Sequence, residues 1–426
     1  MSITRRQFLK TCSLAGSTWL TTACTMPTLT QWTQQAPAQL PPPELHVWSS
    51  THRLDSAFAH WRRTNDNWPM RRRSFTGWSM VEALAQALRG EIDLPDVVIA
   101  PSSTLAYCHI PGVWRTMPVT PEMRQLGVPA SFTQFQSEAN ELFGLPLTVN
   151  PLGIWYHADL VAKAGLPGEP ADMSSLWSGG WQAVWSTATT LHETLPMLET
   201  FSSIFDDVYR PQVWHHLNQA LPTAAIVETV RTIFATSTQM AGLMQMPQMM
   251  HFDGNWFDAI QREQVAFLVA GRDMKMALQR TQIDDVSAWR VAVPPTGLIA
   301  GDGLGVAIPV ASKHTDLALQ FASQLHQNVR LQVMLSESTQ HVPCMREATT
   351  LPEWAGGDAF AGGQELGTFW SQGVLAMQSA PRTALHTAIL RHIEQLQAAY
   401  WSGRISETLL WQSIESLDVA ALKFTV

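Results

Sequence analysis

Charged residues and long apolar runs are scarce in this sequence. Only 15% of the 426 residues are charged, and the formal net charge is −8. This balance offers no electrostatic attraction for nucleic acid, so we expect no nucleic-acid partner. No run inside the chain is long and apolar enough to predict a membrane span. The length exceeds what one hydrophobic core fills and predicts two or three domains.

Cysteine is equally rare, with four residues and no CxxC pair. Cys12 and Cys24 fall in the N-terminal segment, and Cys108 and Cys344 lie far apart in the rest of the chain. This spacing gives no zinc or redox motif. We expect Cys108 and Cys344 to be buried free thiols, and we expect no cofactor.

Catalytic motifs are also missing. The sequence has no G-x-S-x-G and no H-E-x-x-H. The acidic doublets at 206–207 and 284–285 are typical of solvated surface, because adjacent side chains point in different directions. The segment 214–216, Trp-His-His, lacks a third metal ligand at a recognisable spacing. We expect no catalytic residue and no metal site, and a secreted glycan-active enzyme is the alternative from another class.

Tryptophan, in contrast, is abundant, with 18 Trp against 4 Tyr. A Trp side chain has a large apolar face and one N–H donor. Most of these residues must fill hydrophobic cores. A few are candidates for stacking on the rings of a ligand in a cleft.

The N-terminus has the layout of an export signal. Three basic residues precede a short, weakly apolar stretch that ends at Cys24. The run TRRQFLK is similar to the twin-arginine signal, and TTAC at 21–24 is similar to a lipoprotein cleavage box. We expect residues 1–24 to be a signal and Cys24 to carry a lipid, with simple cleavage after a small residue as the alternative. Residues 25–43, rich in Thr, Gln and Pro, predict an extended tether.

Strands and helices alternate after the tether. The run ELHVWSS predicts a strand, and the spacing of Leu54, Phe58 and Trp61 predicts a helix. The run PMRRRSF predicts a second strand, whose arginines are typical of an edge strand or a solvated face. The run DVVIA is almost wholly apolar, as in a buried parallel sheet covered by helices. Later, VAFLVAGRDMKMAL predicts a strand, a tight turn and a helix, and the C-terminus predicts two amphipathic helices split at Ser402–Gly403.

Four segments, in this order, resemble the extracellular solute-binding proteins of ABC importers, in particular the family that includes maltose-binding protein. They are LHVWS; GLPLTVNPLGIWYHADLVAKAGLP; VAVPPTG through GVAIPVASKHTDLALQFASQL; and SGRISETLLWQSIESL. Together these segments span most of residues 44–417.

The resemblance implies an α/β fold of two lobes, each with a central, mostly parallel sheet flanked by helices. One lobe would hold residues 44–150 plus 296–342 and the other 151–295 plus 343–426, with a hinge at 148–150. The implied function is capture of a small molecule, first of all a sugar, between the lobes and its delivery to ABC transporter permease subunits. The protein would be a monomer in the periplasm or at the outer face of the cytoplasmic membrane, attached through a lipid anchor.

The resemblance also implies a set of ligand-binding residues beside the hinge. Trp suits stacking on a sugar ring, and polar groups on loops suit hydrogen bonds to its hydroxyls. The expected ligand-binding residues are Trp48, Ser50, Trp78, Ser102, Asn150, Trp155, Tyr156, Gly271, Arg272 and Asp302. For the three Trp residues, a position in a core is the alternative.

Two departures from the maltose binders leave the ligand open. His386 stands where those proteins place a Trp, and Arg272 with Asp273 stands where an aromatic residue is common. Arg272 and the run Arg71–Arg73 make a phosphorylated ligand, such as a sugar phosphate or a glycerol phosphodiester, the alternative. A sensor or adhesin with the same fold is a further alternative to transport.

Overall fold

The computed structural model describes the body of the chain that follows the predicted tether. The described residues are 43–416, except 67, 77–78, 110–111, 138, 197, 202–203, 220–224, 226–227, 237–250, 253, 282–287, 353 and 355. The predicted signal, the predicted lipidation site Cys24, the tether up to residue 42 and Trp78 lie outside them. Within these ranges, no helix has both the length and the apolar character needed to cross a membrane.

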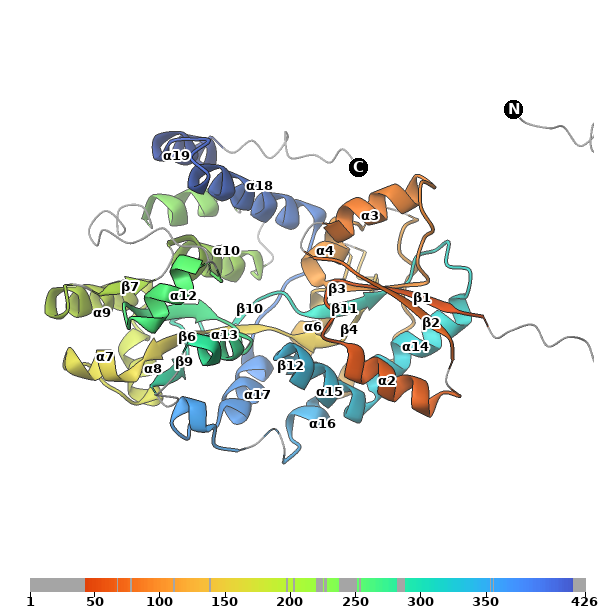
Figure 1. Cartoon of the computed structure of the whole chain (residues 1–426), viewed down its shortest axis with the longest axis horizontal. Helices are drawn as coiled ribbons and strands as arrows, with labels where there is room; N and C mark the ends of the chain where they lie inside the picture. The colour runs from red at the N-terminus through yellow and green to blue at the C-terminus, as the bar shows by residue number, and fades with distance from the viewer. Residues whose placement is uncertain are drawn as a thin grey trace, which may run out of the picture. The chain divides into compact units, whose positions relative to one another are not determined.

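The first sheet has five strands in the order β2-β1-β3-β11-β4 (Figure 1). Their bounds are β1 Leu45–Ser49, β2 Met70–Ser74, β3 Val97–Pro101, β4 Leu145–Pro146 and β11 Leu304–Ala307. β1 is parallel to β2 and β3, as the alternation of strands and helices predicts. β2 lies at the edge with mostly exposed side chains, which confirms the prediction for MRRRS.

Helices on both sides bury this sheet in one hydrophobic core. They are α2 Asp55–Thr64, α3 Ser79–Leu88, α4 Ser102–Tyr107, α5 Pro121–Leu126, α6 Pro129–Thr133, α14 Thr315–Gln327 and α15 Val329–Thr339. The predicted face of α2 is correct, because Phe58 and Trp61 are buried against Phe321 of α14. Cys108 lies in this core as a free thiol, as expected, and burial raises its pKa to about 12.

The second sheet has the order β10-β6-β8-β7, and β9 also pairs with β6. The bounds are β6 Pro151–His157, β7 Glu199–Phe201, β8 Val265–Ala270, β9 Trp289–Ala292 and β10 Ile299–Ala300. The predicted strand, turn and helix of VAFLVAGRDMKMAL are confirmed by β8, which is buried throughout, and α13 Met274–Thr281.

Separate hydrophobic clusters form around the second sheet. The surrounding helices are α7 Ala158–Lys163, α8 Pro170–Trp177, α9 Trp181–Thr194, the π-helix η1 Ile204–Tyr209, α10 Arg210–Leu217, α12 Gly254–Gln261, α16 Arg346–Thr349, the 3-10 helix η2 Ala359–Ala361, α17 Leu366–Ala376, α18 Ala384–Trp401 and α19 Glu407–Glu415. α18 and α19 pack with α10, and they confirm the predicted helix pair split at Ser402–Gly403.

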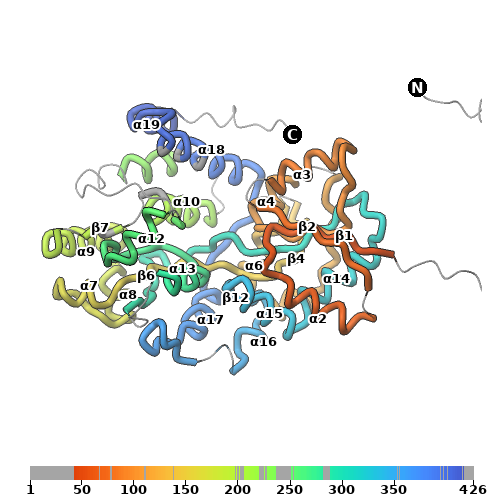
Figure 2. Tube along the Cα trace, viewed as in Figure 1, coloured from red at the N-terminus to blue at the C-terminus, as the bar shows by residue number. Residues whose placement is uncertain are grey.

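Three chain segments run between the two sheets and pair with one another. The first passes from β4 through β5 (Thr148–Val149) into β6. The second returns antiparallel beside it, because β10 pairs with β6 and β11 pairs with β4. These two segments are yellow and cyan in Figure 2. The third, β12 (Val342–Pro343), pairs antiparallel with β5. β10 still belongs to the second sheet, so the return crosses at residues 301–303 and not at residue 296.

The crossings also explain why the sheets are mixed rather than mostly parallel as predicted. β11 and β4 are parts of crossing segments, and β11 runs against β3. In the second sheet, β6 is antiparallel to β8, β9 and β10, and the pair β7 and β8 is parallel. Strands connected by a helix within one lobe run parallel to each other, whereas a strand that enters directly from the other lobe runs in the opposite direction.

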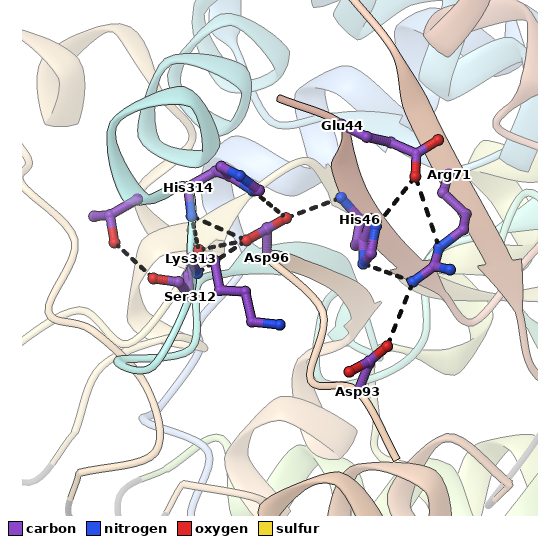
Figure 3. Close-up of polar contacts among 9 residues, drawn as sticks. Glu44, His46, Arg71, Asp93, Asp96, Ser312, Lys313 and His314 are labelled. Carbon is purple, nitrogen blue, oxygen red and sulfur yellow. Dashed lines mark hydrogen bonds and ion pairs between the residues drawn. The ribbon is translucent and has the colours of Figure 1, made fainter. Parts of the chain in front are cut away.

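One buried carboxylate ties the first lobe together (Figure 3). Asp96, 4% exposed, accepts hydrogen bonds from the His46 amide at the start of β1 and from the Ser312 hydroxyl and the His314 amide before α14. Burial alone would raise the pKa of Asp96, but these hydrogen bonds outweigh it and hold the pKa below its usual value. Nearby, Arg71 on the edge strand is bonded to the His46 ring.

Glycine allows the crossing segments to approach closely. A Cβ atom on Gly303 would lie 2.3 Å from the carbonyl oxygen of Thr148, and one on Gly301 would lie 2.7 Å from that of Asn150. Real atoms do not approach so closely, so a side chain at either position would push the segments apart.

We therefore expect Gly303→Ala to lower the free energy of unfolding by ~1–3 kcal/mol, the usual cost of overpacking. Urea denaturation measures the change. Gly356→Ala is the matched control, because a Cβ atom there meets nothing within 4 Å, and we expect a change within ~0.5 kcal/mol. Equal effects of the two substitutions would show that the crossing tolerates a side chain.

Candidate functional site

The two aromatic residues expected at the cleft wall, Trp155 and Tyr156, are instead fully buried. β6 is paired on both edges, and hydrophobic clusters cover both faces of its sheet. Trp155 packs near Trp370 and donates its indole N–H to the Gly271 carbonyl at 3.0 Å. Tyr156 packs against Trp177 in the other cluster. Both rings fill cores in this structure, and neither presents a face to a ligand.

Trp48 also belongs to a core. It is 6% exposed, its ring centroid lies 4.9 Å from that of Phe75, and the Arg73 guanidinium lies over it at 5.6 Å. Ser50 follows β1, and its amide donates to the Ile99 carbonyl. Two of the three Trp residues expected to stack on a ligand are therefore buried, and Trp78 is outside the described residues.

Two of the predicted polar residues, Ser102 and Asp302, do come together. The Ser102 hydroxyl lies 2.7 Å from the Asp302 carboxylate, which also accepts bonds from the amide and hydroxyl of Ser103. Gln134 lies beside them and donates to the Gly301 carbonyl. Asp302 thus joins the return crossing to the start of α4, and its oxygens are largely occupied.

Asn150, Gly271 and Arg272 gather on the second-lobe side of the crossing. A Cβ atom on Gly271 would lie 2.0 Å from the Asn150 side-chain oxygen, so glycine at this turn lets the Asn150 side chain lie directly against it. The Arg272 guanidinium stacks over the Trp354 ring at 4.2 Å. Burial, opposed by Asp358, lowers the pKa of Arg272 to about 10. The Asn150 Oδ1 and Arg272 Nη1 atoms have no hydrogen-bond partner among the described residues.

Sequence reasoning missed two residues at the same crossing, Arg382 and Asn218. Both donate to the Ala300 carbonyl, at 2.8 Å from Arg382 and 3.0 Å from Asn218. Arg382 is 3% exposed, and its guanidinium lies 4.0 Å from the Trp214 ring. The Arg382 Nε and Nη1 atoms and the Asn218 Oδ1 atom have no partner in the described part of the chain. In the sequence, the single arginine in the run MQSAPRTAL was the one indication that Arg382 could belong to a site.

His386 lies one helical turn beyond Arg382. It is 7% exposed, and its Nδ1 atom has no hydrogen-bond partner within the described ranges. Burial, together with the charge of Arg382, lowers the pKa of His386 to about 4. The ring is therefore neutral at neutral pH, and Arg382 remains the charged group at this place.

A cavity of about 620 Å³ adjoins the Ala300 carbonyl. Its volume is within the range of sites for small organic ligands. Its walls combine amide side chains, backbone and apolar groups from His215, Asn218, Val293, Thr296, Gly297, Leu298, Ile299, Ala300, Phe369, Gln372, Gly373, Ala376 and Gln378. None of the ten predicted residues lines it. A second cavity, of about 340 Å³, lies at the edge of the first sheet, where Trp48 and Arg71–Arg73 line it with His46, Ile92 and Asp93.

Comparison with solved structures gives the fold. No protein-family model and no curated protein matches the sequence. A structure described as extracellular solute-binding protein family 1 has a TM-score of 0.77 at 14% identity, over 89% of this chain and 100% of that one. The sugar-binding protein MalE from the phytopathogen Xanthomonas citri has a TM-score of 0.67 at 15% identity, over 89% and 97%. The ABC transporter associated binding protein from B. animalis subsp. lactis Bl-04, in complex with beta-1,6-galactobiose, has 0.67 at 14%, over 88% and 96%.

The chain has the two-lobed fold of the extracellular solute-binding proteins. In this solute-binding fold, α18 of the second lobe touches α4 of the first. Thr387 donates to the Ser103 carbonyl at 3.0 Å, and Arg391 donates to the Tyr107 hydroxyl at 3.1 Å. Arg382 directly precedes the N-cap of α18 and His386 lies in its first turn, so both are near the end of the helix that contacts the first lobe.

No metal centre is visible in the described part of this solute-binding fold. Within it, no three His, Cys, Asp or Glu side chains are placed to hold a metal ion. The His215 ring is bonded to Gln219 and lies beside His216. The polar groups at the crossing can offer hydrogen bonds and positive charge to a ligand, which is the chemistry of binding.

Because Trp155 is a core residue, we expect Trp155→Ala to lower the free energy of unfolding by ~3–5 kcal/mol, the usual cost of removing a large buried aromatic ring. Urea denaturation provides the test. Leu375→Ala is the control, since Leu375 on α17 is 51% exposed, and it should change the value by less than ~0.5 kcal/mol. A Trp155→Ala protein of unchanged stability would return Trp155 to the list of ligand contacts.

The lowered pKa of His386 predicts a pH dependence of stability. In the unfolded chain His386 binds a proton near its usual pKa of 6.5, whereas in the fold it does so near pH 4. Protons therefore favour the unfolded chain between these values, and stability present above pH 6.5 is lost as the pH falls. The loss from this one group is about 3 kcal/mol at most.

The test is urea denaturation of the wild type and His386→Gln between pH 4 and pH 7. The variant should lose less stability on acidification than the wild type. A control variant, His52→Gln, changes an exposed residue and should follow the wild type. Identical pH profiles for the wild type and His386→Gln would contradict a neutral buried ring.

Proposed function

We propose that this protein is an extracytoplasmic solute-binding protein that captures a carbohydrate between its lobes and delivers it to the permease of an ABC transporter. The observation that carries the proposal is a set of buried polar atoms at the crossing that have no partner among the described residues, and they belong to Asn150, Arg272, Arg382 and His386. Buried polar groups are normally hydrogen-bonded, so several unmatched ones in one region favour a missing ligand.

Binding would work through rotation of the lobes about the crossing segments. A ligand favours the closed arrangement only by contacts that it makes with both lobes. The second lobe offers Arg382 and His386, and the first offers the groups around Ser102, Ser103 and Asp302. The contact of α18 with α4 closes one side of this region.

The carbohydrate part of the proposal is supported by the relatives of known ligand. The B. animalis neighbour is in complex with beta-1,6-galactobiose, and another neighbour, of TM-score 0.65 and 14% identity, is a protein from Bifidobacterium longum in complex with lacto-N-biose. In the proposal, the chain is a binding protein and not an enzyme. Ligand contacts come from Ser102, Asn150, Gly271, Arg272 and Asp302, as the sequence indicates, together with Arg382 and His386.

The N-terminal sequence supports a place outside the cytoplasm. The twin-arginine-like run predicts export, Cys24 would carry the lipid, and residues 25–43 would connect this anchor to the lobes. An extended tether of this kind would hold a monomeric binding protein near a membrane permease.

The test is a thermal-shift screen of the purified protein against mono- and oligosaccharides, sugar phosphates and polyols. A ligand at a hundredfold excess over its Kd should add about 2.7 kcal/mol to the stability of the native state. We expect one chemical class to raise Tm by several degrees and to compact the protein in small-angle X-ray scattering. No response to any of these compounds would contradict a carbohydrate ligand, and conversion of a compound to product would favour the glycan-active enzyme.

A further inference from the structure

Arg382 is a buried cation that has no ion-pair partner among the described residues. Its side chain makes one hydrogen bond, from Nη2 to the Ala300 carbonyl, and its face rests on Trp214. The donors on Nε and Nη1 have no hydrogen-bond partner within the part of the chain that the structure describes. Transfer of a guanidinium from water into a protein is strongly unfavourable unless charge and donors are both satisfied. The Arg382 guanidinium is therefore placed as a group that a bound ligand would complete.

The neighbouring titratable groups do not supply that partner. Asp302 is the acidic residue whose charge reaches Arg382. Its carboxylate is already bonded to Ser102 and Ser103, and no ion pair to Arg382 forms in the described ranges. His386 is neutral at neutral pH because its pKa is lowered. Asp302 therefore acts on Arg382 from a distance, and no described acidic group makes direct contact with its guanidinium.

The backbone adds to the positive potential at Arg382. Arg382 directly precedes Thr383, the N-cap of α18, an 18-residue helix. The N-terminus of a helix carries a partial positive charge and favours anions. Arg382 adjoins this terminus in the chain, and its side chain is only 3% exposed. A buried arginine whose donors no described residue matches is an independent indication of a ligand.

We infer that the ligand of this protein carries an anionic group, a phosphate or a carboxylate, and that Arg382 binds it. This inference rests on the proposed function, since it names the class of ligand that the interlobe site takes. The anion accepts hydrogen bonds from Nε and Nη1 of Arg382. Ala300, whose carbonyl accepts the hydrogen bond from Arg382, also lines the cavity of about 620 Å³, which has room for a neutral polar remainder near Gln372 and Gln378. Arg382 is a specificity residue in this site.

The experiment is isothermal titration calorimetry with matched pairs of compounds. Glucose 6-phosphate is compared with glucose, glycerol 3-phosphate with glycerol, and galacturonate with galactose, so the responding pair distinguishes a phosphate from a carboxylate. We expect the wild type to bind an anionic member at least tenfold more tightly than its neutral counterpart. Arg382→Gln should weaken that binding by roughly 10- to 100-fold, as for a lost hydrogen bond to a charged group, and leave any neutral binding unchanged.

Two further variants separate binding from folding. Arg404→Gln removes an exposed arginine beyond the end of α18 and should retain wild-type affinity. Arg382→Lys keeps the charge and should weaken binding less than Arg382→Gln does. The unfolding midpoint of unliganded Arg382→Gln should not fall below that of the wild type, because an unmatched buried charge is removed.

The outcomes distinguish this inference from the proposal on which it rests. Equal affinity of the wild type for a neutral sugar and its anionic counterpart would overturn the anionic class but leave the sugar-binding function standing. An equal loss of neutral and anionic binding in Arg382→Gln would show a structural role and overturn the inference. If no neutral or anionic compound binds, the proposed function fails and the inference fails with it.

Discussion

The close contact of three antiparallel chain segments at the crossing is the constraint on which the rest of the structure depends. Gly303 lies directly against the Thr148 carbonyl, and Gly301 donates its amide to the Asn150 carbonyl. This contact sets where β4 ends and β6 begins, and it brings the return strand into both sheets. Because the crossings enter each sheet against the direction of its other strands, both sheets are mixed. In the proposed mechanism, the lobes rotate about these segments.

Charge at the crossing is distributed unequally between the lobes. On the first-lobe side, the Asp302 carboxylate accepts hydrogen bonds from Ser102 and Ser103, which stabilise its negative charge and hold it in place. On the second-lobe side, Arg382 and Arg272 rest on Trp rings and retain donors that no described residue matches. An aromatic face stabilises a cation without using its hydrogen-bonding groups. This arrangement keeps arginine available to a ligand while the surrounding core stays packed.

The use of tryptophan shows where local patterns mislead. A Trp on a strand beside a crossing fits a cleft wall and a core equally well. Alternation along the strand shows which face of the sheet the side chain lies on, but it does not show what covers that face. Trp155 is buried since η2 and α17, from a distant part of the chain, lie over it. Trp214 and Trp354 contact Arg382 and Arg272, respectively. In each pair the two residues are more than 80 positions apart, and no spacing in the sequence links an arginine to its Trp.

The sequence by itself determined the class of fold, most strand and helix positions and the existence of crossings. These features follow from local periodicity, from Gly and Pro positions and from the order of four segments that resemble a known family. It also placed Ser102, Asn150, Gly271 and Asp302 near the crossing, since they follow strands whose ends meet there. Only the tertiary structure decided which side chains are buried, that Asn218 and Arg382 share the Ala300 carbonyl, and that Arg382 forms no ion pair with a described residue. Burial and pairing depend on contacts between residues far apart in the chain, and a local pattern carries no information about them.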